Sequence, residues 1–321
     1  HTNLKQNIKI FFTLIMDYLS QGIKLPKKNI DDFVKKKENL LGKGASGEVY
    51  IYDTHTGEKY VVKMIWDGDW EYYEEFYEDI IWQSSIYEQI NKLERSVKVH
   101  GYNHYTDKEG YNYVCFIMDY HEGYCDCFNY LMDREKHWSR EGGTLYKRKD
   151  KDKNDIFFTM DRSKKLSVIK NIILSLKEIH DIDIIHGDIK TNNIIIHPNT
   201  SEAKIIDFGA SMNTESKRLY METEWEHGTL GYRCPEEEFY SLLGKTSDIY
   251  SLAVTIIEVW VGDIWYSGET FKTCRNEVLK ALRILEKEEK DLGAILRKCL
   301  HMDGKRRPTI QKLMNFFQEY S

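Results

Sequence analysis

The chain lacks the repeated C-x-x-C spacing that marks many zinc sites. Its cysteines are scattered, and this scatter also disfavours a disulfide framework. They are Cys115, Cys125, Cys127, Cys234, Cys274 and Cys299. Free thiols persist where the redox environment is reducing. We therefore expect the protein to act in the cytoplasm or the nucleus.

A long apolar run is also absent. A helix that spans a bilayer needs about 20 consecutive apolar residues, whereas the best candidate, residues 8–16, contains Lys9 and is followed by Asp17. We expect no transmembrane segment. We interpret residues 8–16 as a helix packed on the body of the protein rather than as a targeting segment.

Excess positive charge is missing as well. The net charge of −6 argues against general binding of nucleic acids, because that binding relies on basic residues that neutralise phosphates. Proline is rare, with 4 residues, whereas Ile, Lys, Asn and Tyr are abundant. This composition is typical of an AT-rich genome, as in some viruses, parasites and intracellular bacteria, and is compatible with delivery into a host cell.

What the chain does have is length and a globular composition. Its 321 residues are 41% hydrophobic and 31% charged, as in soluble globular proteins. This length exceeds that of one typical compact domain. We therefore expect two lobes with a cleft between them, in a monomer or a weak oligomer.

The first part of the chain predicts a small sheet with one helix. Residues 1–38 carry no catalytic motif, and we expect them to form a helical N-terminal extension. The predicted elements that follow are strands at residues 48–52, 60–65, 97–99 and 113–118 and a helix at residues 71–93. Together they place a first lobe at residues 39–122.

The second part, residues 123–321, predicts a larger and mainly helical lobe. Within it, residues 134–165 are too polar to belong wholly to a core, and we interpret them as an insertion or long loop between two helices. The fold class is therefore α+β, with a small antiparallel sheet in one lobe and mainly helices in the other.

One segment carries the charges that phosphoryl transfer requires. It reads H-G-D-I-K-T-N-N over residues 186–193, and D-F-G follows downstream. Asp188 can accept a proton from a hydroxyl group, and Lys190 can neutralise phosphate. Asn193 and Asp207 offer the oxygen ligands that Mg²⁺ prefers.

A glycine-rich turn lies upstream, on the predicted hairpin. Gly42, Gly44 and Gly47 lack the side chains that would keep backbone N–H groups away from phosphate oxygens. Ordinary hairpins carry such turns as well. Lys63, 16 residues after Gly47 on the next predicted strand, favours a phosphate site, because a buried Lys needs an anionic partner.

In this order, the motifs resemble those of the eukaryotic-type protein kinases. The resemblance covers about residues 39–318 and includes G-T-L-G-Y-R-C-P-E at residues 228–236, S-D-I-Y-S-L at 247–252 and R-P-T at 307–309. It implies the bilobal kinase fold, with ATP and Mg²⁺ or Mn²⁺ as cofactors. It also implies transfer to Ser or Thr hydroxyls of protein substrates.

The resemblance assigns a role to each charged residue. Asp188 would be the catalytic base, and Lys190 would stabilise the transferring phosphoryl group. Asn193 and Asp207 would hold the metal ion.

Lys63 would be oriented by an acid on the following helix, and three acids there are candidates. They are Glu78, Asp79 and Glu88. We select Glu78, which lies 15 residues beyond Lys63.

The resemblance also implies an adenine site. The apolar residues around the base would be Val49, Val61 and Ile195. Residues 117–123 resemble the kinase hinge, with Met118 as the gatekeeper. Asp119 and His121 would offer main-chain contacts to adenine, and Asp126 would reach the ribose.

Further residues would support the site. They are His186, Thr229, Asp248 and the pair formed by Glu236 and Arg307. His186 would brace the catalytic loop and Asp248 would hold its backbone. Thr229 would lie near Asp188 and Lys190 and help to place the acceptor hydroxyl.

Gly187 departs from the family pattern, in which an Arg precedes the catalytic Asp. In many members this Arg pairs with a phosphate on the activation loop. We therefore expect activity that does not require loop phosphorylation through that contact.

Two alternatives to a protein kinase remain open. Small-molecule phosphotransferases of the aminoglycoside-kinase type also carry H-G-D-x-x-x-x-N, and a kinase fold without turnover can serve as a scaffold. The segments downstream of residue 228 favour the protein kinase over the first alternative. A complete set of catalytic residues disfavours the second, namely Lys63, Asp188, Asn193 and Asp207.

Overall fold

The structure is a computed structural model with two compact units. It describes residues 37–44, 47–54, 56–66, 73–107, 109–132, 138–141, 144–147, 160–214, 221–222, 228–262, 264 and 270–320. The first unit contains the described residues up to Lys92 together with Val97–Glu122, and the second contains Leu93–Ser96 and those from Gly123 onward. Of the predicted extension, residues 1–38, all but the last two lie outside the described residues; these two begin the short helix η1 (Lys37–Asn39).

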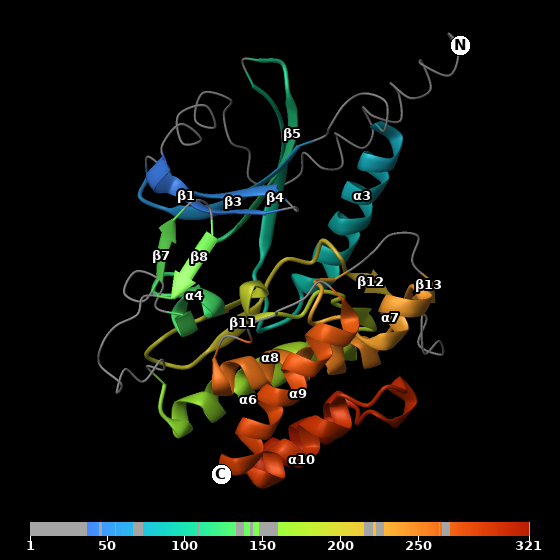
Figure 1. Ribbon diagram of the computed structural model, residues 1–321. Coiled ribbons are helices and arrows are strands. Elements are labelled where there is room, and N and C mark those ends of the chain that lie inside the picture. The colour runs from blue at the N-terminus through green and yellow to red at the C-terminus, as the bar shows by residue number, and fades with distance from the viewer. Residues whose placement is uncertain are drawn as a thin grey trace. The chain divides into compact units, whose positions relative to one another are not determined.

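An antiparallel sheet forms the first unit (Figure 1). Its strands are β1 (Leu40–Gly44), β2 (Gly47–Asp53), β3 (Lys59–Trp66), β4 (Val99–Thr106) and β5 (Asn112–Asp119). Within the described residues their order is β1-β2-β3-β5-β4, and every neighbouring pair is antiparallel. The prediction of a small antiparallel sheet is therefore confirmed.

Side chains alternate between the two faces of this sheet, as the geometry of a strand requires. One face carries a buried apolar cluster of Tyr50, Tyr52, Val62, Met64, Tyr105, Cys115 and Ile117. Val49, Val61 and Lys63 alternate with these residues along β2 and β3, so they lie on the opposite face. The predicted nucleotide residues of these two strands thus share one face.

Helix α3 (Tyr73–Ile90) packs on that second face. Its buried residues Ile80, Tyr87 and Ile90 recur at helical spacing. The ring of Tyr87 lies 5.5 Å from that of Phe116, and Phe116 is the partner of Lys63 in the β3–β5 register. The helix ends at Ile90 rather than at the predicted residue 93.

The predicted strand at residues 97–99 was misplaced. Strand β4 begins at Val99 and continues to Thr106. Before it, the side-chain amide of Asn91 bonds both the N–H and the carbonyl oxygen of Val99, each at 2.8 Å, and so fixes the start of the strand. Gly101 and Asn103 have low strand propensity, so pairing with β5 rather than local sequence defines this strand.

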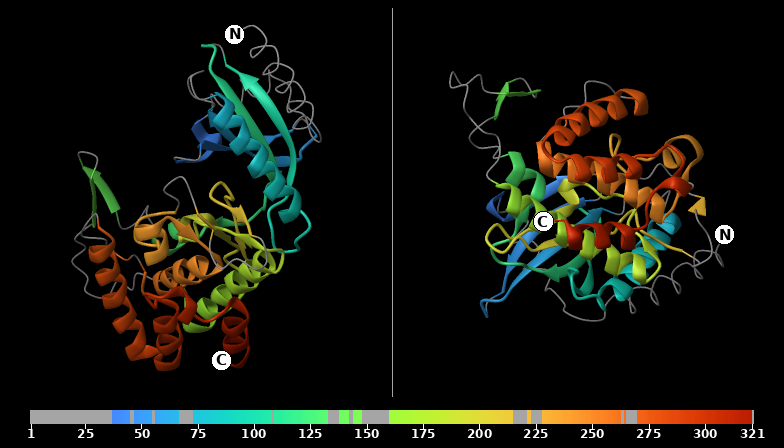
Figure 2. Two further views of the ribbon diagram at one scale, coloured as in Figure 1. Left: turned by 90° about the vertical axis from the view of Figure 1, so that its right-hand side faces the viewer. Right: turned by 90° about the horizontal axis from the view of Figure 1, so that it is seen from below.

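The second unit is mainly helical, as expected (Figures 1 and 2). Its helices are α4 (Cys127–Met132), α6 (Arg162–Asp181), α7 (Pro235–Tyr240), α8 (Lys245–Val261), α9 (Phe271–Glu288), α10 (Lys290–Cys299) and α11 (Ile310–Glu319), with short helices η3 (Thr191–Asn193) and η4 (Gly304–Arg306). Every residue of α8 from Ser247 to Trp260 is buried. This burial all round makes α8 the core helix of the unit, in contact with α6, α9 and α10.

Short strands complete the second unit. They are β6 (Cys125–Asp126), β7 (Trp138–Glu141), β8 (Thr144–Lys147), β9 (Ile184–Ile185), β10 (Ile194–Ile196), β11 (Ala203–Ile205), β12 (Met212–Asn213), β13 (Met221–Glu222) and β14 (Leu242–Leu243). Strands β7 and β8 lie within the predicted insertion at 134–165. Its last residues, Arg162–Lys165, belong to α6, which Asp161 caps by accepting a hydrogen bond from the N–H of Lys164.

All six cysteines lie in the described part of the chain and are free thiols. Burial raises the pKa of Cys115 and Cys299 to about 12, so both thiols stay neutral. Within the described ranges, every helix is too short or too polar to cross a membrane.

The burial of α8 predicts an uneven response to truncation. Ile257 in α8 is 0% exposed, whereas Ile284 in α9 is 54% exposed. We expect Ile257→Ala to lower the free energy of unfolding by about 2–5 kcal/mol. The matched control Ile284→Ala should change it by less than about 0.5 kcal/mol. Urea unfolding of both variants measures this difference, and equal losses would contradict the central position of α8.

Candidate active site

A buried carboxylate on α8 holds the segment that begins at His186. The oxygens of Asp248 accept hydrogen bonds from the backbone N–H groups of His186 at 2.8 Å and Gly187 at 2.9 Å. A third contact joins Asp248 to Nε2 of His180 at 2.8 Å. Asp248 is 1% exposed, and a buried carboxylate requires such donors. The predicted role of Asp248 as the anchor of this loop is confirmed.

The carboxylate of Asp188 lies at the centre of a polar cluster. Its Oδ2 accepts from Nζ of Lys190 at 2.6 Å and from Nδ2 of Asn193 at 2.9 Å. Its Oδ1 accepts from the hydroxyl of Thr229 at 2.8 Å, and that hydroxyl accepts from Lys190 at 2.7 Å. The expected proximity of Thr229 to Asp188 and Lys190 is confirmed.

His186 has both ring nitrogens engaged by the backbone. Nδ1 accepts from the N–H of Asp188 at 3.2 Å, and Nε2 donates to the carbonyl oxygen of Ile206 at 3.1 Å. Its ring lies 5.0 Å from that of Phe208. Because the side chain is fully buried and both nitrogens are bonded, His186 braces the loop, as expected.

The two predicted metal ligands lie at the same end of a hairpin. Strands β10 and β11 pair with Ile194 opposite Ile205, and the N–H of Ile206 donates to the carbonyl oxygen of Asn193 at 2.9 Å. Asn193 therefore precedes one strand and Asp207 closely follows the other. Asp207 adopts φ +64°, a left-handed conformation that is uncommon outside glycine.

This pair fits a hard divalent cation. The side-chain nitrogen Nδ2 of Asn193 is bonded to Asp188. The side-chain oxygen Oδ1 of Asn193 is therefore the atom suited to a metal. The carboxylate of Asp207 supplies a second oxygen, as Mg²⁺ prefers. Among the described residues, no group of three or more His, Cys, Asp or Glu side chains forms a metal cage. Mg²⁺ would thus take further ligands from phosphates and water.

In the first unit, the structural reason for glycine differs among the predicted glycine positions. Gly47 has φ +117°, and a Cβ there would lie 2.2 Å from the carbonyl oxygen of Met64. Gly42 has nothing within 4 Å of such an atom. Gly44 pairs with Gly47 at the turn between β1 and β2. Backbone conformation and the approach of β3 therefore require glycine at 47, independently of any phosphate.

Lys63 is 4% exposed, on the sheet face under α3. The register pairs it with Val49, and it pairs Val61 with Met118. Four predicted nucleotide residues therefore meet on neighbouring strands of one face.

The structure describes the side chains of only two of the three acids that could orient Lys63. The side chain of the selected residue, Glu78, lies outside the described part of the structure. Asp79 is exposed and accepts a hydrogen bond from Nε2 of Gln83 at 2.8 Å, along its own helix. Glu88 is exposed as well. The choice of Glu78 among these acids therefore stays a prediction.

The predicted hinge follows the end of β5. The N–H of Asp119 donates to the carbonyl oxygen of Lys98 at 3.0 Å, which continues the sheet. The carboxylate of Asp119 accepts from the N–H of Lys98 and contacts the imidazole of His100, with His121 at 3.9 Å. The N–H and side chain of Asp119 therefore serve the fold.

Asp126, the predicted ribose contact, has another task. Its carboxylate accepts from the N–H of Asn129 at 2.8 Å and so caps helix α4. Asp126 and the predicted base contact Ile195 are partners in the pairing of β6 with β10. This cap engages one carboxylate oxygen, so the ribose contact of Asp126 stays a prediction.

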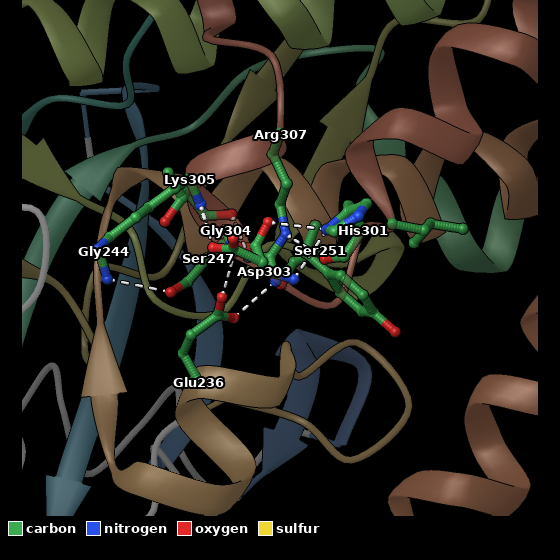
Figure 3. A network of polar contacts seen from close by, with 12 residues as sticks. Glu236, Gly244, Ser247, Ser251, His301, Asp303, Gly304, Lys305 and Arg307 are labelled. Carbon is green, nitrogen blue, oxygen red and sulfur yellow. Dashed lines mark hydrogen bonds and ion pairs between the residues drawn. The ribbon is translucent and has the colours of Figure 1, made fainter.

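Glu236 and Arg307 form a buried pair, as expected (Figure 3). Nη2 of Arg307 lies 2.6 Å from Oε2 of Glu236, and the N–H of Gly304 donates to the other oxygen at 2.5 Å. Arg307 also donates to the carbonyl oxygens of His301 and Thr246. Burial raises the pKa of Glu236, but the Arg307 guanidinium outweighs burial and the net pKa is lowered.

Comparison with known protein families decides what this arrangement is. Residues 35–317 match the protein kinase domain. The chain belongs to the protein kinase family.

Kinases from plants and animals are among its relatives. Wall-associated receptor kinase-like 1 of Arabidopsis thaliana is 30% identical over 194 residues, which are 54% of this chain and 26% of that protein. Wall-associated receptor kinase-like 5 of the same plant is 27% identical over 305 residues, 89% of this chain and 37% of that protein. The membrane-associated tyrosine- and threonine-specific cdc2-inhibitory kinase of Drosophila melanogaster is 26% identical over 149 residues, 46% and 27%. This chain spans less than half the length of each of these relatives.

One buried contact of this kinase was missed in the sequence. Oε2 of Glu258 accepts from the hydroxyl of Thr191 at 2.8 Å and from that of Tyr232. Glu258 lies on α8 and is 1% exposed. Glu258 is the only charged residue from Ile249 to Val261 of α8, and this was the available signal, because a buried charge requires partners. This contact joins the catalytic loop and the segment at residues 228–236 to the same helix.

Gly187 is also required by its backbone. It has φ +80°, and a Cβ there would lie 2.4 Å from the carbonyl oxygen of Ala210. An Arg at this position, usual in the family, would strain the loop of this kinase as it stands. The local backbone arrangement therefore requires glycine at this position.

The buried pair predicts a large loss when it is broken. We expect Arg307→Met to lower the free energy of unfolding by about 3–5 kcal/mol, since it leaves Glu236 charged and uncompensated. The exposed neighbour provides the control Arg306→Met, which should cost less than about 0.5 kcal/mol. Denaturant unfolding measures both. Adding Glu236→Leu to Arg307→Met should recover part of the loss, and no recovery would contradict the pairing argument.

The backbone of Gly187 predicts that Arg cannot simply be restored. We expect Gly187→Arg to lower stability by at least about 1–3 kcal/mol, the usual cost of a strained conformation. It should also fail to make activity depend on phosphorylation. Thermal unfolding, together with activity before and after phosphatase treatment, measures both effects. A fully stable variant that gains phosphate dependence would refute the steric argument.

Proposed function

We propose that this protein kinase transfers the γ-phosphoryl group of ATP to Ser or Thr hydroxyls of protein substrates, with Asp188 as the catalytic base. The observation that carries this proposal is the cluster around Asp188. One carboxylate oxygen contacts Lys190 and Asn193, and the other contacts Thr229. Phosphoryl transfer depends chiefly on positioning and charge stabilisation, and this cluster supplies both.

Asp188 would orient the acceptor hydroxyl and take its proton. Its Oδ1 is bonded to the Thr229 hydroxyl at 2.8 Å, so it already binds one aliphatic alcohol. An acceptor Ser or Thr would present the same group to this carboxylate. Asp188 is partly exposed, with 17% of its side chain accessible, as a base that meets a protein substrate must be.

Lys190 would stabilise the charge of the transferring group. Its ammonium bonds Asp188 and Thr229 and keeps 19% of its side chain accessible. A positive charge held beside the base stabilises the negative charge that develops on the phosphoryl oxygens.

ATP and a divalent cation would use the remaining predicted residues. A bound Mg²⁺ would neutralise phosphate charge, and Asn193 and Asp207 are the residues that would hold it. In the first unit, Lys63 and the turn at Gly44 and Gly47 would hold the phosphates. Mn²⁺ would suit the same oxygen ligands.

A Ser/Thr acceptor is supported by Lys190 and by the segment that begins at Gly228 and Thr229. In the kinases that this chain resembles, this combination accompanies aliphatic acceptors. One relative carries both tyrosine and threonine in its name, so tyrosine belongs in the test.

Replacement of the base tests the proposal. We expect Asp188→Asn to lower kcat by about 10²–10⁴-fold, the range for loss of a general base, with little change in ATP binding. Asp181→Asn, on an exposed part of α6, is the matched control and should keep full activity. Transfer of ³²P from ATP to casein and to myelin basic protein measures kcat. Equal transfer by wild type and Asp188→Asn would rule out the proposed base.

The acceptor class needs a separate measurement. Phosphoamino-acid analysis of the labelled proteins should give phosphoserine and phosphothreonine. Parallel reactions with aminoglycosides and free sugars should give no product. Labelling of tyrosine alone, or of the small molecules alone, would overturn the Ser/Thr assignment.

A further inference from the structure

Glu237 is an unusual group for its position. It follows Glu236 on α7 and is 8% exposed. Its carboxyl group accepts a backbone hydrogen bond from Cys234, but its Oε1 is buried and has no hydrogen-bond partner among the described residues. A buried carboxylate oxygen without a donor is costly when charged. The groups around Glu237 decide whether this buried oxygen is charged.

Two glycine backbones meet beside this oxygen. A Cβ on Gly228 would lie 2.5 Å from Oε1 of Glu237 and 3.2 Å from the carbonyl oxygen of Gly187. Gly228 has φ +68°, a backbone conformation that residues with a side chain rarely adopt. Glu237, Gly228 and Gly187 are therefore packed against one another. This contact joins α7, the segment at residue 228 and the catalytic loop.

The contact leads directly to the base. Gly228 precedes Thr229, whose hydroxyl bonds Asp188 and Lys190. Gly187 precedes Asp188 itself. A shift of Glu237 would therefore move Thr229 relative to the base through a single peptide unit.

Negative charge surrounds Glu237 from several elements. Asp188 on the catalytic loop and Asp248 on α8 oppose its ionisation, whereas Arg233 favours it. Burial is the largest effect, and together these effects raise the pKa of Glu237 to about 8.

The other titratable groups near Glu237 are either paired or neutral. Arg233 donates to the carbonyl oxygen of Gly228 and lies 3.6 Å from Glu238. Glu236 is paired with Arg307. Burial raises the pKa of the Cys234 thiol to about 12, so this thiol stays neutral.

We infer that Glu237 is a positioning residue of the phosphotransfer site: as a neutral carboxylic acid, it supports Gly228 against Gly187 and thereby keeps Thr229 beside Asp188. A neutral acid can occupy this buried position, whereas a carboxylate would be repelled by Asp188 and Asp248 and would leave a charged Oε1 without a donor among the described residues. The inference rests on the proposed function, because it concerns the geometry of the base.

The pH profile of kcat tests this role. We expect kcat of the wild type to fall about tenfold per pH unit above about pH 8, as the neutral form is lost. Glu237→Gln keeps a neutral side chain of the same shape, so its kcat should stay level over this range. KM for ATP should be the same in both. Transfer of ³²P to casein, measured from about pH 6 to about pH 9.5, gives these profiles.

Glu319→Gln is the matched control. Glu319 is an exposed glutamate at the end of α11, and this variant should follow the wild-type profile. Parallel profiles for wild type and Glu237→Gln would overturn the inference. So would a folded but inactive Glu237→Gln, since a neutral isostere must support the contact.

Unfolding gives a readout that does not need activity. The folded pKa of Glu237 is raised above its unfolded value, so its contribution to stability is full below about pH 4.5 and is lost as pH rises through about 8. Glu237→Gln should therefore exceed the wild type in stability by a margin that widens between these values and is constant above them. A margin that does not change with pH would overturn the neutral state. A wild type that transfers no phosphate at any pH would instead refute the proposed function.

Discussion

The carboxylate of Asp248 bonds two consecutive backbone N–H groups of the catalytic loop, at 2.8 and 2.9 Å, from the centre of the second unit. A buried carboxylate is stable only when hydrogen-bond donors surround its oxygens. His180 supplies a third contact to Asp248. Asp188 is the next residue after the second of these amides. The position of the proposed base thus depends on a helix that is itself fixed by burial. Thr229, Lys190 and Asn193 are arranged around that fixed point.

Two adjacent buried acids of α7 have pKa values that are shifted in opposite directions. Glu236 stays charged because Arg307 and the N–H of Gly304 surround its oxygens. Glu237 has the charged neighbours Asp188 and Asp248, and burial and those neighbours raise its pKa to about 8. Neither state follows from residue type. The same side chain, one position apart, becomes an ion-pair anchor in one case and a polar spacer in the other.

Much of this arrangement could be predicted from sequence, because it depends on short segments with a fixed order. The H-G-D-I-K-T-N-N segment singled out Asp188, Lys190 and Asn193, which the structure brings together, and the hairpin pattern placed Lys63 on the strand after the glycine-rich turn. What could not be predicted depends on distant neighbours. Strand β4 exists through its pairing with β5, Asp126 caps a helix, and Glu258 is explained only by hydroxyl groups from two other segments. Gly187 was recognised as a departure from the family, but its φ of +80° and its contact with Ala210 belong to the folded loop.

Asp248 and Glu258 lie ten residues apart on α8, which corresponds to about 15 Å along the axis of an α-helix. Asp248 holds the start of the catalytic loop, and Glu258 holds both Thr191 at its end and Tyr232 in the following segment. One continuous helix therefore sets the distance between the start of the catalytic loop and the segment at Tyr232. The spacing between the catalytic loop and the segment at Tyr232 is therefore determined by the length of α8 between Asp248 and Glu258.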